Sequence, residues 1–507
     1  MADKTDPNYI DPRAPDNRPP MPTPRKEKVR LLEYARMMQK DILSAQPARL
    51  YRAWMAEFKT PFFRSYLTND PEIVTEVLKK RPDDFPKSDR IREGLAPLLG
   101  ESVFVTNGEQ WKQQRRIIDP AFEGGRLRES FAAMWEAAIA TVARLEGLAD
   151  GREVEIEEET SHAAADVIFR TLFSIPIEHE VARQVFAKFK EHQLANPIHN
   201  LGAYVPLPKW FPRFHSRTTR RTAREIRALI EQLTAQRMAE IEAGTAPPDL
   251  ATKIMTTPDP QTGHTFTTQE MVDQVAIFFL AGHETSASAM AWSLCLLAQF
   301  PDWQEKVAAE AFQHLDPERP DFAAVGKLRI CRDVFREALR LYAPVPMMIR
   351  EAQKDEPFRD RVLKKGAQII LSPWHLHRHE RIWDKPHEFH PDRFATDNGK
   401  QALRKAYYPF SAGPRVCPGA GFAMVEGPLI LSHLCRRFHF ELVPDKPAVP
   451  TAHLTVRGAD GIWLKITPRD PKPYESLPEP EKAKDRPEPR GGCPVTSGPA
   501  GRCPVGP

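Results

Sequence analysis

The stretch Phe410-Ser-Ala-Gly413-Pro-Arg415-Val-Cys417-Pro418-Gly419-Ala-Gly-Phe-Ala423 decides the fold, because a tight loop here opens into an apolar run with helical spacing. Cys417 comes just before the expected helix start, where the helix dipole and unpaired backbone N–H groups favour thiolate over thiol. Gly413 and Gly419 have no Cβ, so the backbone can come close to a flat ligand. Arg415 offers a forked cation that suits a carboxylate.

A thiolate, a close backbone and a carboxylate-binding arginine together describe the proximal side of a haem held by cysteine. Such a ligand pushes electron density onto iron and favours O–O cleavage. The alternative is a buried structural cysteine without a ligand role.

Three further motifs lie upstream of Cys417. They are Trp111-Lys-Gln-Gln-Arg115, Ala281-Gly282-His283-Glu284-Thr285, and Glu337-Ala-Leu-Arg340 with Arg393 of Pro-Asp-Arg-Phe. Together with the cysteine loop, their order resembles the cytochrome P450 family over roughly residues 28 to 468. The resemblance implies one large, mostly helical domain with small β-sheets, which is the cytochrome P450 fold. We expect residues 1–27 and 469–507 to be disordered, since both are rich in proline and charge.

The resemblance also implies the residues that hold the cofactor, haem b. Cys417 is the expected iron ligand, and Phe410 and Gly419 belong to the same loop. The expected propionate-binding side chains are Trp111, Arg115, Arg350 and Arg415. Two buried propionates carry charge that must be neutralised, which the arginines would do.

Gly282, Glu284 and Thr285 are the expected catalytic residues. A threonine hydroxyl turned toward its own helix backbone can leave a groove beside Gly282 in which dioxygen fits. Glu284 and Thr285 would then supply protons as general acids. A zinc His-Glu-x-x-His site is excluded, because Ala287 stands at its fifth position. A metal site among the five histidines of 375–390 is not favoured, because their spacing alternates along an extended segment and no cysteine lies nearby.

Glu337 and Arg340 share a helix face and can pair. With Arg393 they resemble the family's structural triad, which braces the cysteine loop. By analogy with the family, an apolar substrate pocket is expected from Ile277, Phe278, Ala281, Val345, Met347 and Met348.

The implied function is a haem-thiolate monooxygenase that uses O2 to hydroxylate or O-dealkylate a hydrophobic small molecule. The sequence contains neither a ferredoxin-type cysteine run nor a second nucleotide-binding region. We therefore expect external electron donors, either a ferredoxin with its reductase or a flavodoxin-type protein. An acidic ferredoxin would suit a basic surface formed by Arg115, Arg116, Arg404, Lys405 and Arg415. A peroxide-driven peroxygenase and a non-enzymatic haem sensor or electron carrier are the alternatives.

Two Cys-Pro-Val triplets, at 493–495 and 503–505, resemble short haem-sensing motifs.

Composition sets limits on these readings. With 507 residues, 41% of them hydrophobic, the chain can bury a core, and a net charge of +4 gives no sign of nucleic-acid binding. Six cysteines without a Cys-x-x-Cys pair suggest a reducing compartment. The N-terminal residues contain neither a signal peptide nor a membrane span. We therefore expect a cytoplasmic protein without a membrane anchor, of the soluble bacterial type.

Local patterns predict the remaining elements. Asp70-Pro71 starts a helix to about Lys80, and Thr267-Thr-Gln-Glu270 is a capping box opening a helix that can reach Phe300. Other helices are expected at 107–119, 126–149, 159–173 and 327–342, and strands at 62–67, 346–352, 360–372 and 453–466, with Gly366 and Asp460-Gly461 as turns. Segments 82–106 and 196–215 are expected to be irregular.

Overall fold

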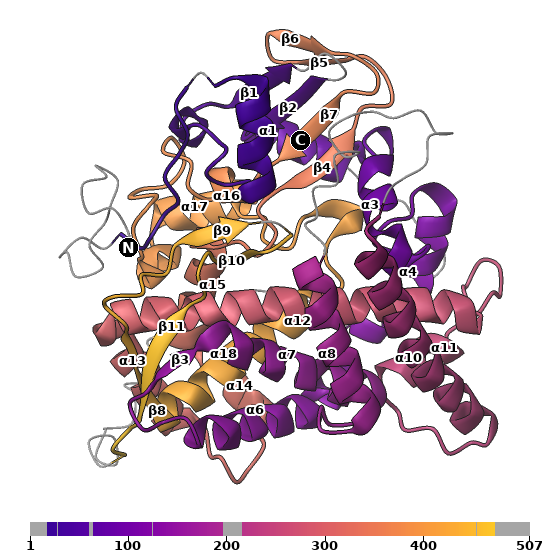
Figure 1. The fold of residues 1–507 in the computed structure, drawn as a ribbon, viewed down its shortest axis with the longest axis vertical. Coiled ribbons are helices and arrows are strands. Elements are labelled where there is room, and N and C mark those ends of the chain that lie inside the picture. Colours follow the sequence, from indigo (N-terminus) through magenta and orange to yellow (C-terminus); the bar gives the residue numbers. More distant parts are fainter. Residues whose placement is uncertain are drawn as a thin grey trace.

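The computed structural model describes residues 18–27, 29–59, 64–123, 125–195, 215–452 and 454–471. A body of helices surrounds one long helix, and a smaller region built on a β-sheet lies to one side of it (Figure 1). This arrangement agrees with the expected fold, in which helices dominate and the sheets are small.

The helices of the first half include a long antiparallel group that packs beneath the central helix in Figure 1. They are α1 (Leu31–Lys40), α2 (Pro71–Thr75), α3 (Asp89–Leu99), α4 (Gly108–Phe122), α5 (Arg126–Glu129), α6 (Phe131–Glu146), α7 (Ile156–Phe173), α8 (Glu180–Ala195), α10 (Arg217–Glu242) and α11 (Leu250–Thr256).

The second half contains the central helix and the helix that follows the cysteine loop. Its helices are α12 (Thr268–Gln299), α13 (Pro301–His314), α14 (Phe322–Val325), α15 (Arg329–Leu341), α16 (Pro373–Leu376), α17 (Asp397–Ala406) and α18 (Ala420–Arg437). Short 3-10 or π turns are η1 (Ala48–Tyr51), η2 (Glu76–Lys80), η3 (Pro82–Asp84), η4 (Pro391–Ala395) and η5 (Gly413–Arg415).

The largest described sheet has the strand order β1-β2-β7-β4, with β2 and β7 parallel and the other pairs antiparallel. Its strands are β1 (Met55–Lys59), β2 (Arg64–Thr68), β4 (Met348–Glu351) and β7 (Gln368–Leu371). A three-stranded antiparallel sheet has the order β3-β11-β8, from Glu153–Glu155, Trp463–Pro468 and Phe438–Leu442. The two-stranded pairs are β5–β6 (Glu356–Phe358, Arg361–Leu363) and β9–β10 (Pro450–Ala452, Val456–Gly458).

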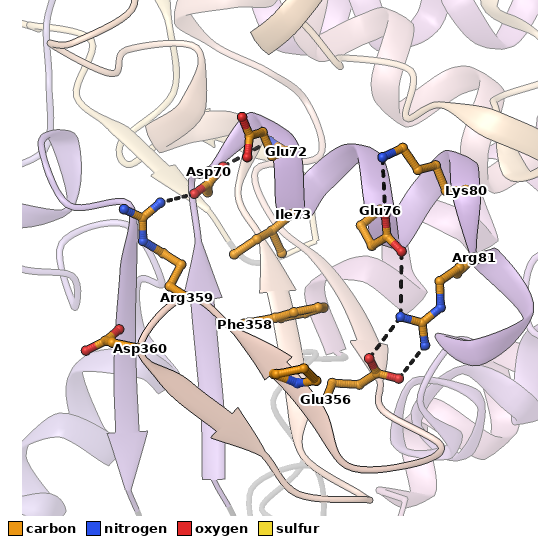
Figure 2. Close-up of a pocket in the computed structure, with 11 residues that line it drawn as sticks. Asp70, Glu72, Ile73, Glu76, Lys80, Arg81, Glu356, Phe358, Arg359 and Asp360 are labelled. Atoms are coloured by element: carbon orange, nitrogen blue, oxygen red, sulfur yellow. Dashed lines mark hydrogen bonds and ion pairs between the residues drawn. The ribbon is translucent and has the colours of Figure 1, made fainter.

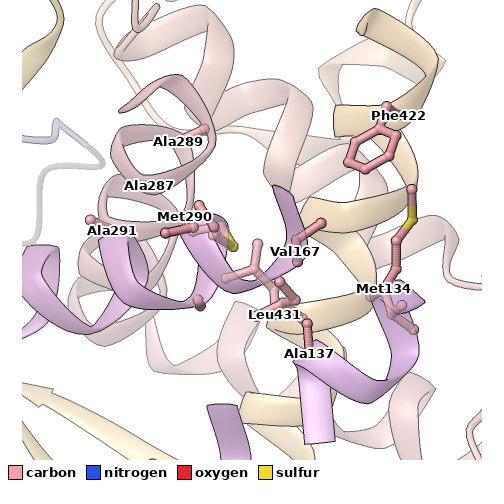
Figure 3. Close-up of a cluster of buried hydrophobic side chains, with 14 of the residues drawn as sticks. Met134, Ala137, Val167, Ala287, Ala289, Met290, Ala291, Phe422 and Leu431 are labelled. Carbon is pink, nitrogen blue, oxygen red and sulfur yellow. The ribbon is translucent and has the colours of Figure 1, made fainter. Parts of the chain in front are cut away.

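The helix α12 forms the centre of the core. Its N-terminus is fixed by the predicted capping box, in which the Thr267 hydroxyl accepts from Glu270 N–H and the Glu270 carboxylate accepts from Thr267 N–H. Figure 3 shows its small and flexible side chains Ala287, Ala291 and Met290 in a hydrophobic cluster with residues of α6, α7 and α18. Small side chains let these helices approach closely, so burial around α12 stabilises the whole helical body.

One sequence-based expectation about irregular segments is corrected. Segment 82–106 is not only a loop, because α3 forms within it, with Ile91, Leu95 and Leu98 at helical spacing. The expected turn at Asp460-Gly461 lies between β10 and β11, which belong to different sheets, since β10 pairs with β9 while β11 pairs with β3 and β8. The prediction for 196–215 lies almost entirely outside the described residues.

The domain boundaries at residues 27 and 469 stay a prediction. Within the N-terminal segment, the described residues from 18 onward contact the helical body. Tyr342 donates its hydroxyl hydrogen to Pro20 O at 2.8 Å, and Arg25 pairs in a parallel β-bridge with Pro47. In the part of the chain that the structure describes, no helix combines the length and the apolarity that a bilayer crossing requires.

Candidate active site

Cys417 lies between the short turn η5 and the first residue of α18, as the sequence predicted for its helix-start position. Its N–H donates to Phe410 O at 2.9 Å, and Ala420 N–H donates to Cys417 O at 3.3 Å, so both sides of the loop are fixed. Gly413 has φ +69°, and a Cβ there would lie 1.9 Å from Leu78 O. Glycine is therefore required at 413 because the backbone of η2 lies there. This reason differs from the expected one, which was close approach of a flat ligand.

Cys417 is exposed to solvent, although enough protein surrounds its thiol for desolvation to matter. Burial raises the pKa of the thiol above its ordinary value, while the Gly419 N–H, Arg115 and Lys87 lower it by less. The backbone N–H of the loop therefore favours thiolate as expected, but burial of the thiol outweighs it. A coordinating metal ion removes a thiol proton outright, so the thiolate depends on the metal.

Arg350 and Arg415 are two of the expected anion-binding side chains. Arg350 is 4% exposed, donates to Ile349 O at 3.0 Å, and has no carboxylate partner among the described residues. Arg415 donates to Asn107 Oδ1 at 2.8 Å, and its guanidinium carbon lies 4.1 Å from the Trp111 ring centroid. Burial lowers the pKa of each arginine to about 10.

Lys87 joins this cation cluster, and sequence reasoning missed it. Its Nζ donates to Phe104 O at 2.5 Å and lies 3.6 Å from the Phe104 ring centroid. Burial lowers the pKa of Lys87 well below its ordinary value, and repulsion from Arg350, Arg415 and Arg115 lowers it further. No local motif marks this lysine, because only the fold brings its loop to the arginines.

Arg115 and Trp111 occupy one face of α4. The Arg115 guanidinium donates to Asp119 Oδ2 at 3.0 Å and to Val416 O at 2.8 Å, so it contacts the cysteine loop directly. Trp111 is buried beneath Arg415. Among Lys87, Arg115, Arg350 and Arg415, only Arg115 has a carboxylate partner in the described structure. Arg350 is buried and the other three are partly buried, and unpaired positive charges removed from water in this way are destabilising unless an anion binds there.

One stripe of α12 is left uncovered opposite its packed faces. Between residues 271 and 298, every side chain of α12 is buried except those of Phe278, Ala281, Gly282 and Thr285. These four positions have the spacing i, i+3, i+4 and i+7, so they share one helix face. The Thr285 hydroxyl donates to Ala281 O at 2.7 Å, which is the orientation expected for an oxygen-binding groove.

Gly282 and Glu284 have structural contacts that the sequence did not reveal. A Cβ on Gly282 would lie 2.4 Å from Ile168 Cδ1, so a larger residue here would have to displace the Ile168 side chain of α7. Glu284 is buried, and its carboxylate accepts from Thr455 Oγ1 at 2.9 Å and pairs with Arg457. The expected acid is therefore held in an ion pair, on the side of α12 that faces the hairpin β9–β10.

Comparison with known proteins places the chain in a family. The model of the family described as "Cytochrome P450" matches residues 19–466.

The chain belongs to the cytochrome P450 family.

Relatives of this P450 include three plant proteins. Cytochrome P450 CYP72A616 of Paris polyphylla is 29% identical over 78% of this chain and 78% of its own length. The 11-oxo-beta-amyrin 30-oxidase of Glycyrrhiza uralensis is 30% identical over 78% and 77%. Cytokinin hydroxylase of Arabidopsis thaliana is 29% identical over 79% and 78%. The expectation of a bacterial-type protein is not borne out, since these relatives are plant enzymes.

A solved structure also has the same fold. The crystal structure of the cytochrome P450DA heme domain superposes with a TM-score of 0.75, covering 89% of this chain and 98% of that one, at 24% identity. This likeness supports the expected single-domain, mostly helical P450 fold.

The cofactor of this P450 is haem b, and the residues at the site fit it. Cys417 would ligate the iron, and the unpaired cations Arg350, Arg415 and Lys87 would hold the propionates. The buried Arg350 without a carboxylate partner is the observation that tests this fit, because such a cation needs an anionic ligand.

The predicted triad is assembled below the cysteine loop. Arg340 donates to both oxygens of Glu337 at 2.8 Å, and Arg393 Nε donates to Glu337 Oε1 at 2.9 Å. Arg340 also donates to the carbonyls of His377, Pro386 and Glu388, at 2.8, 2.6 and 2.9 Å. The triad therefore fixes the chain between α16 and η4 onto α15, ahead of the loop that carries Cys417.

The expected pocket residues lie near the uncovered stripe or on the segment leading into β4. Ile277 is buried, while Phe278 is partly exposed with its ring 5.8 Å from that of Phe122. Ala281 is exposed, and Val345, Met347 and Met348 are partly exposed.

The histidine-rich segment is structural among the described residues. His377 Nε2 accepts from Tyr408 N–H at 2.8 Å, and His379 stacks on Trp54 with centroids 4.3 Å apart. No group of three metal-ligating side chains is found in the described ranges.

The expected basic docking surface is smaller than predicted. Arg116 donates to both oxygens of Asp259 at 2.6 and 3.0 Å, while Arg115 and Arg415 make the internal contacts described above. Arg404 and Lys405, on α17, are exposed. Only these two of the five predicted cations are therefore presented to solvent without such internal contacts.

A separate, charged cleft lies between α2–η2 and the hairpin β5–β6 (Figure 2), with a volume of about 830 Å³. Arg81 donates to both oxygens of Glu356, at 3.0 and 2.5 Å, and Arg359 pairs with Asp70. The cleft contains none of the predicted site residues, and its charged walls do not suit a hydrophobic substrate.

Proposed function

We propose that this P450 is a monooxygenase that hydroxylates or O-dealkylates a hydrophobic small organic molecule with electrons from external redox partners. The observation that carries the proposal is the uncovered stripe of α12, formed by Phe278, Ala281, Gly282 and Thr285. A helix buried on its other faces leaves these residues free to contact ligands.

Haem supplies the iron that activates dioxygen, and the chain supplies binding, orientation and protons. Thr285 presents its hydroxyl at the stripe, and Glu284 stands next to it as the acid that replenishes protons there. Arg350, Arg415 and Lys87 would hold the propionates and so fix the plane of the cofactor.

The substrate is proposed to be hydrophobic, because Phe278, Ala281, Val345, Met347 and Met348 offer mainly apolar surface. Methionine adapts its shape to irregular ligands. The printed names of two relatives, an 11-oxo-beta-amyrin oxidase and a cytokinin hydroxylase, support oxidation of an organic substrate.

A ferredoxin with its reductase, or a flavodoxin-type protein, is proposed as the electron donor in a cytoplasmic setting. The support for this proposal is that exposed Arg404 and Lys405 on α17 offer positive charge to an acidic partner.

The experiment that tests this proposal compares turnover by the haem-loaded protein under two conditions, with O2 and an electron-transfer chain or with hydrogen peroxide alone. Binding spectra against fatty acids, terpenoids and alkyl-aryl ethers first select the probe with the largest spin-state change. Turnover of that probe with NADPH, ferredoxin and reductase, and little with hydrogen peroxide alone, supports the proposal. Turnover with peroxide only would identify a peroxygenase, and spectral haem binding without turnover would identify a sensor or carrier.

A further inference from the structure

The carboxylate of Glu284 is held by the hairpin β9–β10 and the turn that joins its strands. One oxygen accepts from Thr455 Oγ1 at 2.9 Å, and the other pairs with Arg457 NH2 at 2.5 Å. Glu284 is 4% exposed, whereas the Arg457 side chain is 42% exposed. The ion pair therefore links a buried acid on the central helix to the solvent.

A second carboxyl lies at the same place on the hairpin. Glu157, in the first turn of α7, accepts from Gly458 N–H at 3.1 Å, and Gly458 directly follows Arg457. Burial raises the pKa of Glu157 to about 7, and Arg457 opposes the rise while the carboxylates of Glu155 and Glu284 add to it. Glu157 therefore changes protonation near neutral pH.

The groups that face Glu157 come from three elements. They are Glu155 on β3, Arg457 on β10, and Glu284 and Cys295 on α12, with His283 Nε2 lying 4.0 Å from Glu284 Oε1. The carboxylates of Glu155 and Glu284 raise the pKa of Glu157 while Arg457 lowers it, so repulsion among the three carboxyl groups favours one bound proton.

His283 is the other neighbouring group that could supply a proton to Glu284, and its surroundings exclude it. The imidazole is 1% exposed and lies among the rings of Phe186, Phe189 and Phe279, with centroids 5.0 to 6.1 Å away. Burial lowers the pKa of His283, so it remains neutral and has no route to solvent.

We propose that Glu157 is the solvent-side group from which Glu284 takes its protons, and that Arg457 moves between the two carboxylates as the charge moves. The inference rests on the role of Glu284 in the proposed function. The O–H bond of the Glu157 carboxyl breaks and an O–H bond forms on the Glu284 carboxylate, while the negative charge passes to Glu157. Arg457 then pairs with Glu157, which takes a new proton from solvent.

The test uses the haem-loaded protein carrying Glu157→Gln, with Glu158→Gln as the matched control. Glu158 is one residue further along α7, is exposed and pairs with Lys190, so its removal changes the same charge without touching Glu284. Infrared titration of the protein should show a protonated-carboxyl component that disappears near pH 7 in the wild type and in Glu158→Gln and is missing in Glu157→Gln, whereas the component of Glu426, which disappears near pH 8, remains in all three.

Turnover of the selected probe provides the second readout. With NADPH, ferredoxin and reductase, Glu157→Gln should turn over roughly tenfold more slowly, which is less than the about 10²–10⁴-fold that a direct acid contributes. Its solvent isotope effect should rise and its rate should lose the decline seen above neutral pH. Thr455→Val should leave the pH profile in place, because Arg457 still holds Glu284.

The outcomes separate this inference from the proposed function. If Thr285→Ala uncouples electron use from product while Glu157→Gln matches Glu158→Gln in rate and isotope effect, the relay stands and Glu157 is not its entrance. If neither Thr285→Ala nor Glu157→Gln changes turnover, the relay itself is wrong. A component that titrates near pH 7 and is retained in Glu157→Gln overturns the assignment directly.

Discussion

The carboxyl group of Glu426 lies between α18 and α12, and replacing it tests how its burial affects the free energy of unfolding. The side chain is 1% exposed, Ser286 donates to its Oε2 at 2.8 Å, and its Oε1 has no partner among the described residues. Burial raises the pKa of Glu426 to about 8 from an ordinary 4.5. The folded protein therefore holds this carboxyl in its neutral form at pH 7.

The raised pKa predicts a loss of stability as pH increases. The unfolded chain loses this proton near pH 4.5 and the folded chain only near pH 8, so the contribution is complete below 4.5 and disappears as pH rises to 8. At about 1.4 kcal/mol per pH unit, the difference between those pKa values amounts to roughly 5 kcal/mol of unfolding free energy. Glu426→Gln keeps the shape of the neutral carboxyl and should lose this dependence.

Urea unfolding of the haem-loaded protein at pH 5, 7 and 9 measures the effect, with the exposed Glu441→Gln on β8 as the control. Glu426→Gln should gain stability relative to wild type as pH increases, by roughly 4 kcal/mol between pH 5 and pH 9. Parallel pH profiles for the wild type and Glu426→Gln would refute the reasoning, because the carboxyl would then titrate alike in both states.

Three other predictions concern the cofactor site. Arg350→Ala should release haem to apomyoglobin faster than the exposed Arg404→Ala, because a propionate loses its buried partner; equal release rates would remove Arg350 from the site. Glu337→Gln should lower the unfolding free energy by roughly 3–5 kcal/mol in urea titrations, since two buried arginines lose their carboxylate, and a change under about 1 kcal/mol would contradict a buried network. Gly413→Ala should reduce the fraction of protein with a thiolate-type ferrous–carbonyl spectrum, because its Cβ would meet Leu78 O at 1.9 Å; a full thiolate spectrum would show that the loop can shift.

Local sequence patterns were enough to predict the elements whose ends are marked by specific residues. The capping box Thr267–Glu270 predicted the start of α12, and the apolar run after Cys417 predicted α18. Both signals depend on residues within one turn of each other, which is the range over which backbone capping and helix periodicity act.

The remaining features depend on contacts between distant segments. Lys87 approaches Arg350 and Arg415 only when its loop, strand β4 and the cysteine loop fold together, and Arg457 reaches Glu284 from a hairpin far along the sequence. α3 was missed because Pro97 and Gly94 suggested a loop, although Pro97 lies in the last turns of the helix. Tertiary packing determines these features, and a short stretch of sequence does not show which distant segments pack together.

The backbone contact between Leu78 and Gly413 makes the cysteine loop and η2 one mechanical unit. The charged cleft of Figure 2 lies along the same α2–η2 segment, with Glu76, Lys80 and Arg81 on its wall. A shift of the loop large enough to relieve or tighten that contact must displace the amides of residues 76–80. The hydrogen-exchange rates of these amides therefore report how tightly the loop that carries Cys417 is held in place.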